Sequence, residues 1–180
     1  MQKRAHVTLL IQAGADTTGT GMGSVLRFIL TNPVVLARVR EEINDAEAKG
    51  LLSTPIRYDE TRQHLPFFVA CIKESLRLNP PAPNLFPRIV PQGGKVIDGH
   101  FVPAGTEITN NAWTIQRNKD FYGEDAEEFK PERWMESEQR SFRLEAAQFT
   151  FGAGPRVCLG KEVAMLEMHK LLPEVSLSLD

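Results

Sequence analysis

The sequence predicts a mainly α-helical protein with a small β-sheet, and three observations support this class. Apolar residues recur at helical spacing in several long segments, whose ends are marked by proline, glycine or asparagine. A short stretch in the middle of the chain surrounds an Asp-Gly turn, as β-hairpins do. The length of 180 residues is enough for one domain with its own core, so we expect residues 1–180 to form one unit.

The composition excludes several classes of protein. A hydrophobic fraction of 42% and a net charge of −2 are ordinary for a globular chain, and basic residues alternate with acidic ones, so no nucleic-acid partner is expected. Two cysteines, Cys71 and Cys158, are too few for a structural zinc site or a disulfide framework. No apolar run reaches membrane-spanning length and none follows Met1, so we expect no anchor or signal peptide within this chain.

Helices account for most of the first half of the chain. We expect long helices over 3–30 and 33–50, with a candidate short helix near 58–62. Pro66 opens a further, strongly apolar helix over 67–78. Glycine lowers helix stability by up to about 1 kcal/mol relative to alanine. The first helix nevertheless contains a cluster that needs a structural reason: Gly14, Gly19, Gly21 and Gly23.

The second half begins with short strands. A hairpin is expected over 95–102, and a further strand over 106–110. Residues 118–149 contain no long periodic segment, so we expect a mostly irregular meander that wraps a cofactor-bearing core. An amphipathic helix is then expected from Cys158 to about Leu172.

The segment FGAGPRVCLG, residues 151–160, places one cysteine among glycines, an aromatic residue and an arginine. Gly152 and Gly154 allow backbone conformations that other residues rarely adopt. At the N-terminus of a helix, the dipole and the free N–H groups favour the thiolate form of Cys158. Taken alone, the cysteine could also be a buried, apolar-like residue in a glycine turn.

The pattern F-x-x-G-x-R-x-C-x-G resembles the haem-binding loop of the cytochrome P-450 family at every fixed position. The resemblance implies haem b (iron protoporphyrin IX) with the Cys158 thiolate as the proximal iron ligand. Phe151 would pack beside the sulfur, Gly154 would shape the loop, and Arg156 would bind a haem propionate. Arg156 also favours the eukaryotic microsomal type, because bacterial members more often have histidine there.

A second motif, AGADTT, lies in the first helix and resembles the family's oxygen-activation motif. The resemblance makes Asp16 and Thr17 the catalytic residues. The Thr17 hydroxyl would hold a water, and Asp16 would help to carry protons inward. Gly14 would permit a local opening of the helix ladder. Taken alone, the segment favours a small-residue packing face with a solvated aspartate.

Two further motifs, KESLR and PERW, follow in the order that the family shows. Glu74 and Arg77 are spaced i, i+3, so they share one helix face. By the resemblance they form a buried cluster with Arg133, which is structural and holds the cofactor loop in shape. The family more often has phenylalanine where this chain has Trp134. Without the resemblance, Glu74 and Arg77 would be expected to form a weak surface ion pair.

The remaining candidates carry weaker signals. Arg88 resembles the family arginine that reaches the second propionate, although a surface arginine is an equal alternative. Cys71 is expected in the core. The histidines are expected to be ordinary surface or loop residues, because none pairs with another at helical spacing: His6, His64, His100 and His169.

The resemblance implies an oxidoreductase, a haem-thiolate monooxygenase that inserts one atom of dioxygen into a small, lipophilic organic substrate. Its electrons would come from an NADPH-dependent reductase that docks on the cysteine side. The parent protein would reside at the endoplasmic reticulum membrane, with the catalytic part facing the cytosol. A haem-thiolate isomerase or dehydratase and a non-catalytic remnant remain open. The intact Asp16–Thr17 pair argues against the isomerase.

Family members are far longer than this chain, so the resemblance covers a partial haem domain: the C-terminal portion of the fold, truncated at both ends. We therefore expect apolar faces of the first helix to lack partners. We also expect the isolated fragment to fold poorly, to bind haem weakly and to be inactive.

Overall fold

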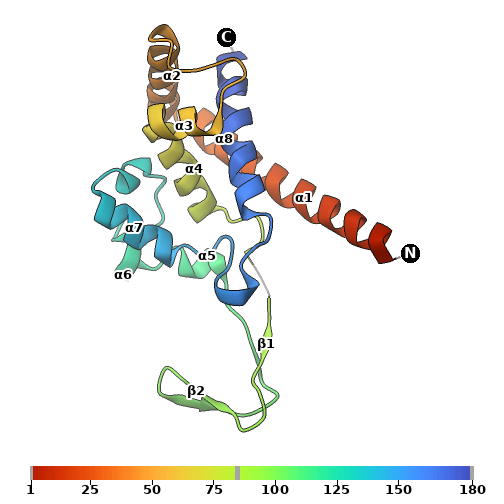
Figure 1. Cartoon of the computed structure of the whole chain (residues 1–180). Helices are drawn as coiled ribbons and strands as arrows, with labels where there is room; N and C mark the ends of the chain where they lie inside the picture. The colour runs from red at the N-terminus through yellow and green to blue at the C-terminus, as the bar shows by residue number, and fades with distance from the viewer. Residues whose placement is uncertain (1, 84–85, 179–180) are drawn as a thin grey trace.

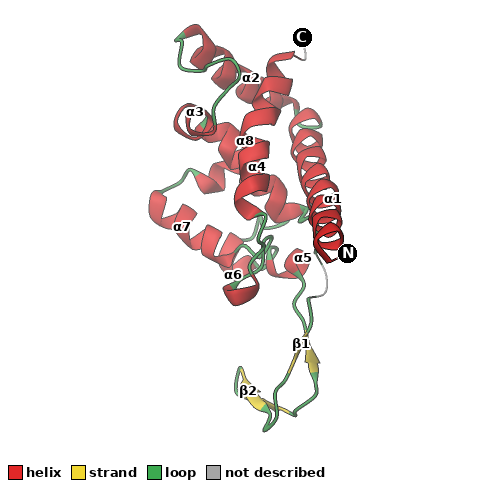
Figure 2. Cartoon of the chain, turned by 45° about the vertical axis from the view of Figure 1, so that its right-hand side comes forward, coloured by secondary structure: helices red, strands yellow, loops and turns green. Residues whose placement is uncertain are grey.

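The computed structural model describes residues 2–83 and 86–178, and it is mainly helical with two small antiparallel sheets, which confirms the predicted class. The helices gather into one body, and the strands lie on an arm that extends away from it (Figure 1). A view from a second direction shows the same separation (Figure 2).

The helical body contains the four long helices and several short ones. The α-helices are α1 (Gln2–Leu30), α2 (Pro33–Ala48), α3 (Tyr58–His64), α4 (Pro66–Leu78), α5 (Ala112–Ile115), α6 (Lys119–Tyr122), α7 (Glu138–Ala147) and α8 (Lys161–Ser178); two 3-10 turns are η1 (Pro131–Trp134) and η2 (Gly154–Arg156). The predicted starts of the second and fourth helices at proline are confirmed.

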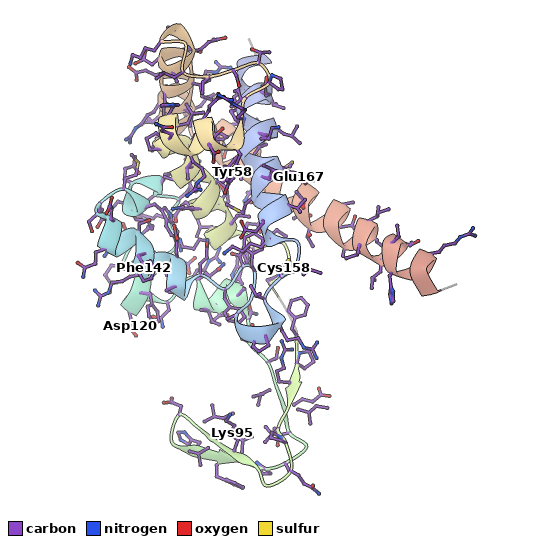
Figure 3. All side chains as sticks on the ribbon, in the orientation of Figure 1. Tyr58, Lys95, Asp120, Phe142, Cys158 and Glu167 are labelled. Carbon is purple, nitrogen blue, oxygen red and sulfur yellow. The ribbon has the colours of Figure 1, made fainter. Side chains whose placement is uncertain are left out.

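The arm consists of two strand pairs. The hairpin β2 (Lys95–Ile97) and β3 (His100–Val102) is confirmed, and its turn residues Asp98 and Gly99 both have positive φ, 48° and 76°. The strand predicted over 106–110 is shorter, because β4 (Glu107–Ile108) pairs only with the two-residue strand β1 (Arg88–Ile89). Figure 3 shows Lys95 on this arm, well separated from the helices.

The core lies where α1, α2, α4 and α8 meet. The C-terminal half of α1 packs there, whereas Val7, Leu10 and Ile11 in its N-terminal half are more than half exposed, at 55%, 61% and 67%. The expectation that this helix has an unpartnered apolar face is therefore confirmed. The buried core residues include Val25, Ile29, Val39, Ile43, Phe68, Cys71, Ile72, Leu76, Met168 and Leu172.

Close packing explains one glycine in α1. A Cβ on Gly21 would lie 2.6 Å from the Cε atom of Met168 on α8, so a side chain there would force the end of this methionine to move. Gly14, Gly19 and Gly23 have open space where a Cβ would lie. The glycine cluster therefore has a packing reason at one position only.

The region predicted as an irregular meander contains regular structure. Helices α6 and α7 and the turn η1 all lie within residues 118–149, so the prediction was wrong for this part of the chain. Helix α7 begins at a Ser137 N-cap, whose side chain accepts a hydrogen bond from the Arg140 N–H. Leu144 is the buried residue of this helix, and it packs against Tyr122 and Trp134 in a second, smaller core.

Helix α8 also differs from its predicted bounds. It begins at Lys161 rather than at Cys158, and it continues past Leu172 and through Pro173 to Ser178. Proline has no N–H, so residue 173 cannot donate to the His169 carbonyl as a helix requires. The Thr61 hydroxyl on α3 donates to that carbonyl instead, with an Oγ1–O distance of 2.7 Å. A contact with α3 thus compensates for the interruption.

His169 is buried at the α3–α8 contact, so the expectation that it is an ordinary surface or loop residue was wrong. Its side chain is 2% exposed, its Nδ1–H donates to the Met165 carbonyl at 2.7 Å, and its ring meets Tyr58 edge-on. Burial lowers the pKa of His169, the positive charges of Arg62 and Lys73 lower it further, and the hydrogen bond to Met165 opposes them.

This lowered pKa predicts that acid destabilises the fold. An unfolded histidine has a pKa of about 6.5, so below that pH the unfolded chain binds a proton that the folded chain excludes. The free energy of unfolding should therefore fall as pH decreases from 6.5, by at most about 1.4 kcal/mol per pH unit for one group. Urea unfolding between pH 8 and 5 should show a shallower dependence in His169→Gln. Equal slopes in both proteins would contradict the prediction.

No single helix among residues 2–83 and 86–178 is long and apolar enough to cross a membrane. Segments Arg4–Leu30 and Pro33–Ala48 together have sufficient length and apolar content, but they are bent by 104° at the break between them.

Candidate functional site

The cysteine loop is held in shape by its own backbone. The Cys158 N–H donates to the Phe151 carbonyl at 2.8 Å, which closes the loop, and the Gly152 N–H donates to the Phe149 carbonyl at 3.0 Å. Gly152 and Gly154 have φ angles of 70° and 65°, a region that favours glycine. The sequence pattern thus produces a closed loop that presents one exposed thiol, Cys158.

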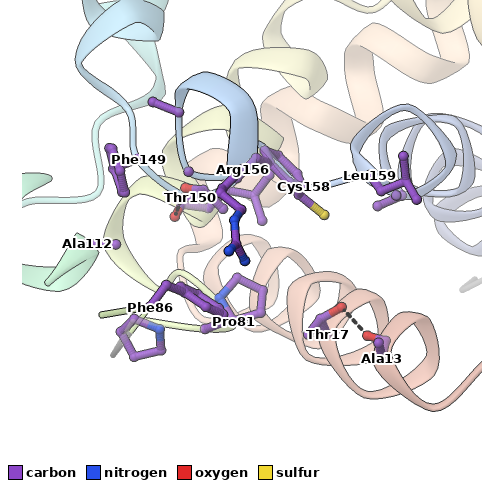
Figure 4. Close-up of a pocket in the computed structure, with 18 of the residues that line it drawn as sticks. Ala13, Thr17, Pro81, Phe86, Ala112, Phe149, Thr150, Arg156, Cys158 and Leu159 are labelled. Atoms are coloured by element: carbon purple, nitrogen blue, oxygen red, sulfur yellow. Dashed lines mark hydrogen bonds between the residues drawn. The ribbon is translucent and has the colours of Figure 1, made fainter. Parts of the chain in front are cut away.

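A cavity of about 660 Å³ lies between the cysteine loop, α1, the segment after α4 and the start of the strand arm. This volume is within the range of roughly 300–1,000 Å³ that is usual for cofactor and small-molecule sites. Figure 4 shows Cys158 and Arg156 on the loop and Thr17 on α1, with Pro81 and Phe86 along another side. Figure 3 places Cys158 at the end of the helical body nearest the arm.

The structure brings most of the predicted site residues together. Those that line the cavity are Thr17, Arg88, Phe151, Arg156 and Cys158. Asp16 is exposed on α1 and does not line the cavity, and Gly154 lies beside the cavity in the loop backbone. The roles that the resemblance assigns to these residues remain predictions.

The Thr17 hydroxyl donates to the Ala13 carbonyl at 2.7 Å, one helical turn earlier (Figure 4). Helix α1 runs without interruption through this region, so the local opening expected at Gly14 is not observed. Gly14 does line the cavity, and a Cβ there would meet no atom within 4 Å. The α1 wall of the cavity therefore carries two hydroxyls, those of Thr17 and Thr18, beside the apolar Leu10 and Ala13.

Two arginines add positive charge to the cavity. Within the part of the chain that the structure describes, Arg156 makes no hydrogen bond or ion pair, so its guanidinium is available to an anion. Arg88 lies on β1 and uses Nη1 to donate to the carbonyls of Phe86 and Pro87, at 2.8 and 3.0 Å. Both are exposed, and neither has a carboxylate partner among the described residues.

The cavity fits a flat group that has one metal and carboxylate substituents. Cys158 is the cavity residue with a metal-binding thiol, and it lies just before the N-terminus of α8. Gly160 lines the cavity next to it, and a Cβ at this position would project into open space. A thiolate donor, a flat backbone surface and free guanidinium groups are what a haem needs from a protein.

The charged cluster predicted from KESLR and PERW is confirmed. The side chains of Glu74, Arg77 and Arg133 are essentially inaccessible, with at most 1% exposed. Arg77 binds Glu74 through two parallel hydrogen bonds of 2.7 and 2.8 Å, and the Arg133 Nε–H donates to Glu74 at 2.8 Å. None of these three residues lines the cavity, which agrees with a structural role rather than contact with a bound group.

Asp125 adds a second carboxylate to this cluster, and no motif in the sequence pointed to it. Its carboxylate accepts from Arg133 at 3.0 Å and from Lys130 at 2.7 Å. Hydrogen bonds from Lys130 and Arg133 lower the pKa of Asp125 to about 2, although burial opposes the shift. Burial disfavours the charged form of Arg133, but the attraction of Glu74 and Asp125 outweighs it, so the pKa of Arg133 is raised.

Trp134 has a role that phenylalanine could not fill. Its indole Nε1–H donates to Glu74 Oε2 at 2.9 Å, and its side chain is almost completely buried. Glu74 thereby accepts a hydrogen bond from an aromatic side chain as well as from both arginines. The departure from the family pattern therefore adds a donor to a buried carboxylate.

The comparisons with known proteins agree with this geometry. The family model described as cytochrome P450 matches residues 1–175. A zebra fish cytochrome P450 solved with progesterone superimposes with a TM-score of 0.76 at 32% identity, covering 92% of this chain and 36% of that one. The fold and the cysteine loop define a haem-thiolate class of protein. This chain belongs to the cytochrome P450 family.

Two fungal relatives show how much of such a protein is present. The chain is 41% identical to the cytochrome P450 monooxygenase cicH of Emericella nidulans over 93% of its own length and 33% of the relative's. It is 42% identical to a pisatin demethylase of Fusarium vanettenii over 97% of its own length and 33% of the relative's. The chain thus spans about a third of the length of these relatives.

Proposed function

We propose that this chain forms the haem-binding and oxygen-activating part of a monooxygenase that oxidises a small, lipophilic organic molecule. The observation that carries the proposal is the Cys158 thiol on a closed loop, facing a cavity whose opposite wall contains Thr17. Membership of the cytochrome P450 family and the monooxygenase and demethylase names of the fungal relatives support it.

The residues of the chain have separate tasks in this proposal. Cys158 would bind the iron through its thiolate, while Arg156 and Arg88 would pair with the two propionates. When bound, the haem supplies the activation of dioxygen. The Thr17 hydroxyl would orient a water and hold a proton at Oγ1, and the exposed Asp16 would exchange protons with solvent.

We also propose an NADPH-dependent reductase as the electron donor, docking on the side of the cysteine loop. The location proposed for the protein is the endoplasmic reticulum membrane, with this part in the cytosol. Support for both comes from the resemblance to the eukaryotic microsomal type that Arg156 favours. The cavity is lined largely by apolar and small side chains, which supports a lipophilic substrate.

Labelled dioxygen distinguishes the monooxygenase from an isomerase. In the haem-loaded protein supplied with NADPH and a reductase, one labelled oxygen atom should appear in the product of a lipophilic test substrate. Thr17→Ala should consume reductant while forming less product, and Thr17→Ser should restore the yield because it keeps the hydroxyl. Product that carries no labelled oxygen in this reaction with NADPH and reductase would contradict the proposal.

A non-catalytic remnant remains the second candidate, and one observation favours it. Apolar side chains are exposed on α1 and beside the cysteine, where Leu159 is 90% exposed. Because these apolar side chains stay exposed, a haem bound here would be less enclosed than a cofactor normally is. Haem titration of the 180-residue chain should therefore show weak binding, and a cooperative melt with stoichiometric haem would exclude this candidate.

A further inference from the structure

Gln116, directly after α5 (Ala112–Ile115), has a completely buried side chain whose hydrogen-bonding groups are all used. Its amide Nε2 donates to the carbonyls of Leu76 and Arg77, at 3.3 and 2.9 Å. Its Oε1 accepts from the Phe149 N–H at 2.7 Å and from the Thr150 hydroxyl at 2.9 Å. The side chain therefore connects two segments that are far apart in the sequence.

The first of these segments is the C-terminal end of α4, where carbonyls lack helical donors. The Thr150 hydroxyl lies 3.1 Å from the Leu76 carbonyl, so it shares its proton between this acceptor and Gln116. The Leu78 carbonyl accepts from Arg117 at 2.6 Å. Gln116 and its neighbours thus satisfy the end of the helix that carries Glu74.

The second segment is the entry of the cysteine loop. Gln116 holds the N–H of Phe149, and the carbonyl of Phe149 accepts from Gly152. The next aromatic residue, Phe151, accepts the hydrogen bond from Cys158 that closes the loop. Phe149, which is bonded to Gln116, is therefore only two residues from Phe151, which is bonded to the Cys158 N–H.

Gln116 is also the link between the buried charged cluster and the loop. Its own carbonyl accepts from Arg77 Nη1 at 2.7 Å. Among the described residues, no member of the Glu74 cluster donates to or accepts from residues 149–160 directly. The cluster therefore reaches the loop through Gln116.

We propose that Gln116 is a positioning residue for Cys158: it fixes the loop entry to the end of α4 and so sets the place of the sulfur relative to the iron. This inference rests on the proposed function of the same site. A residue with a merely structural role would affect unfolding but not the ligation of the haem that is bound.

The chain offers a matched control. Gln148 is partly buried next to the same loop, and its Nε2 donates to the Lys73 carbonyl of α4 at 3.0 Å. Unlike that of Gln116, its side-chain oxygen accepts no hydrogen bond from the loop among the described residues. Gln116→Leu and Gln148→Leu therefore both remove an amide that binds an α4 carbonyl, but only the first also removes the acceptor of the Phe149 N–H and the Thr150 hydroxyl.

The first readout is the Soret band of the reduced carbon-monoxide complex of the haem-loaded protein, compared at equal haem content. The wild type and Gln148→Leu should show the red-shifted band of thiolate ligation, and most of that band should be lost in Gln116→Leu. If Gln116→Leu yields no haem-loaded protein, Thr150→Val decides the question, because it removes only the hydroxyl that joins the loop entry to Gln116 and the Leu76 carbonyl. Partial loss of the band in Thr150→Val supports the proposal, and full retention overturns it.

Amide hydrogen exchange provides a second readout that does not depend on activity. The Phe149 and Cys158 amides should exchange about tenfold faster in Gln116→Leu than in Gln148→Leu, because a released loop opens more often. Unchanged exchange and an unchanged band in Gln116→Leu would overturn this inference alone. Absence of the red-shifted band from the wild type itself would overturn the proposed function, and this inference with it.

Discussion

Replacing Cys158 by serine should abolish the red-shifted Soret band of the reduced carbon-monoxide complex. A serine hydroxyl is not a thiolate, so it cannot supply the sulfur ligand on which that band depends. Cys158 is exposed at the cavity, and the loop that presents it is closed by backbone hydrogen bonds. The substitution should therefore change the ligand without removing the contacts that shape the loop.

Cys71 provides the control for this experiment. It is the other free cysteine of the chain, it is completely buried, and burial raises the pKa of its thiol, so it stays protonated. Cys71→Ala should lower the stability of the fold while the red-shifted band persists in the haem that remains bound. Persistence of that band in Cys158→Ser would contradict the assignment of the iron ligand.

The second large effect is expected for Glu74→Gln, which keeps the shape of the side chain but removes its charge. The Glu74 carboxylate accepts from both arginines, from the Trp134 indole and from the Lys130 N–H. An amide in its place would point its NH2 group at some of these donors, where an acceptor is needed. It would also leave the buried guanidinium groups of Arg77 and Arg133 with Asp125 as the remaining negative charge of the cluster. Breaking a buried ion pair in this way costs about 3–5 kcal/mol of unfolding free energy.

Urea unfolding measured by circular dichroism tests this magnitude, with Glu127→Gln as the control. Glu127 accepts from Arg117 at 2.8 Å, but its side chain is 70% exposed. An ion pair whose carboxylate is exposed to solvent contributes about 0–1 kcal/mol, so its loss should be small. If the two substitutions had equal effects, the Glu74 cluster would not be the central structural element that its burial indicates.

The features that could be predicted from the sequence are those with local causes. Prolines at the first helical position predicted the starts of α2 and α4, and Asp98–Gly99 predicted the turn of the hairpin. The cysteine loop was predicted for the same reason, since its glycines and its closing hydrogen bond lie within ten residues of one another. In each case neighbouring residues restrict the backbone without help from the rest of the chain.

Helix α7 was missed although it is ten residues long. Its sequence is mostly polar, so it shows no apolar stripe, and Leu144 is its buried residue. The helix is stabilised by a serine cap and by contacts with Tyr122 and Trp134 that are distant in the sequence. Periodicity detects a helix only when an apolar face is present.

The partners of the site residues required the tertiary structure. The side chain of Gln116 bonds to Leu76 and Phe149, and the Thr61 hydroxyl bonds to the His169 carbonyl. Asp125 supplies a negative charge to Arg133, which the KESLR and PERW motifs pair with Glu74 alone. Gly21 makes room for Met168 of another helix. Short motifs could therefore predict the chemistry proposed for the chain, because the proposed ligand and its loop are encoded by consecutive residues. The position of that chemistry depends on buried polar contacts between distant segments, and these exist only once packing has excluded water and made each unpaired group costly.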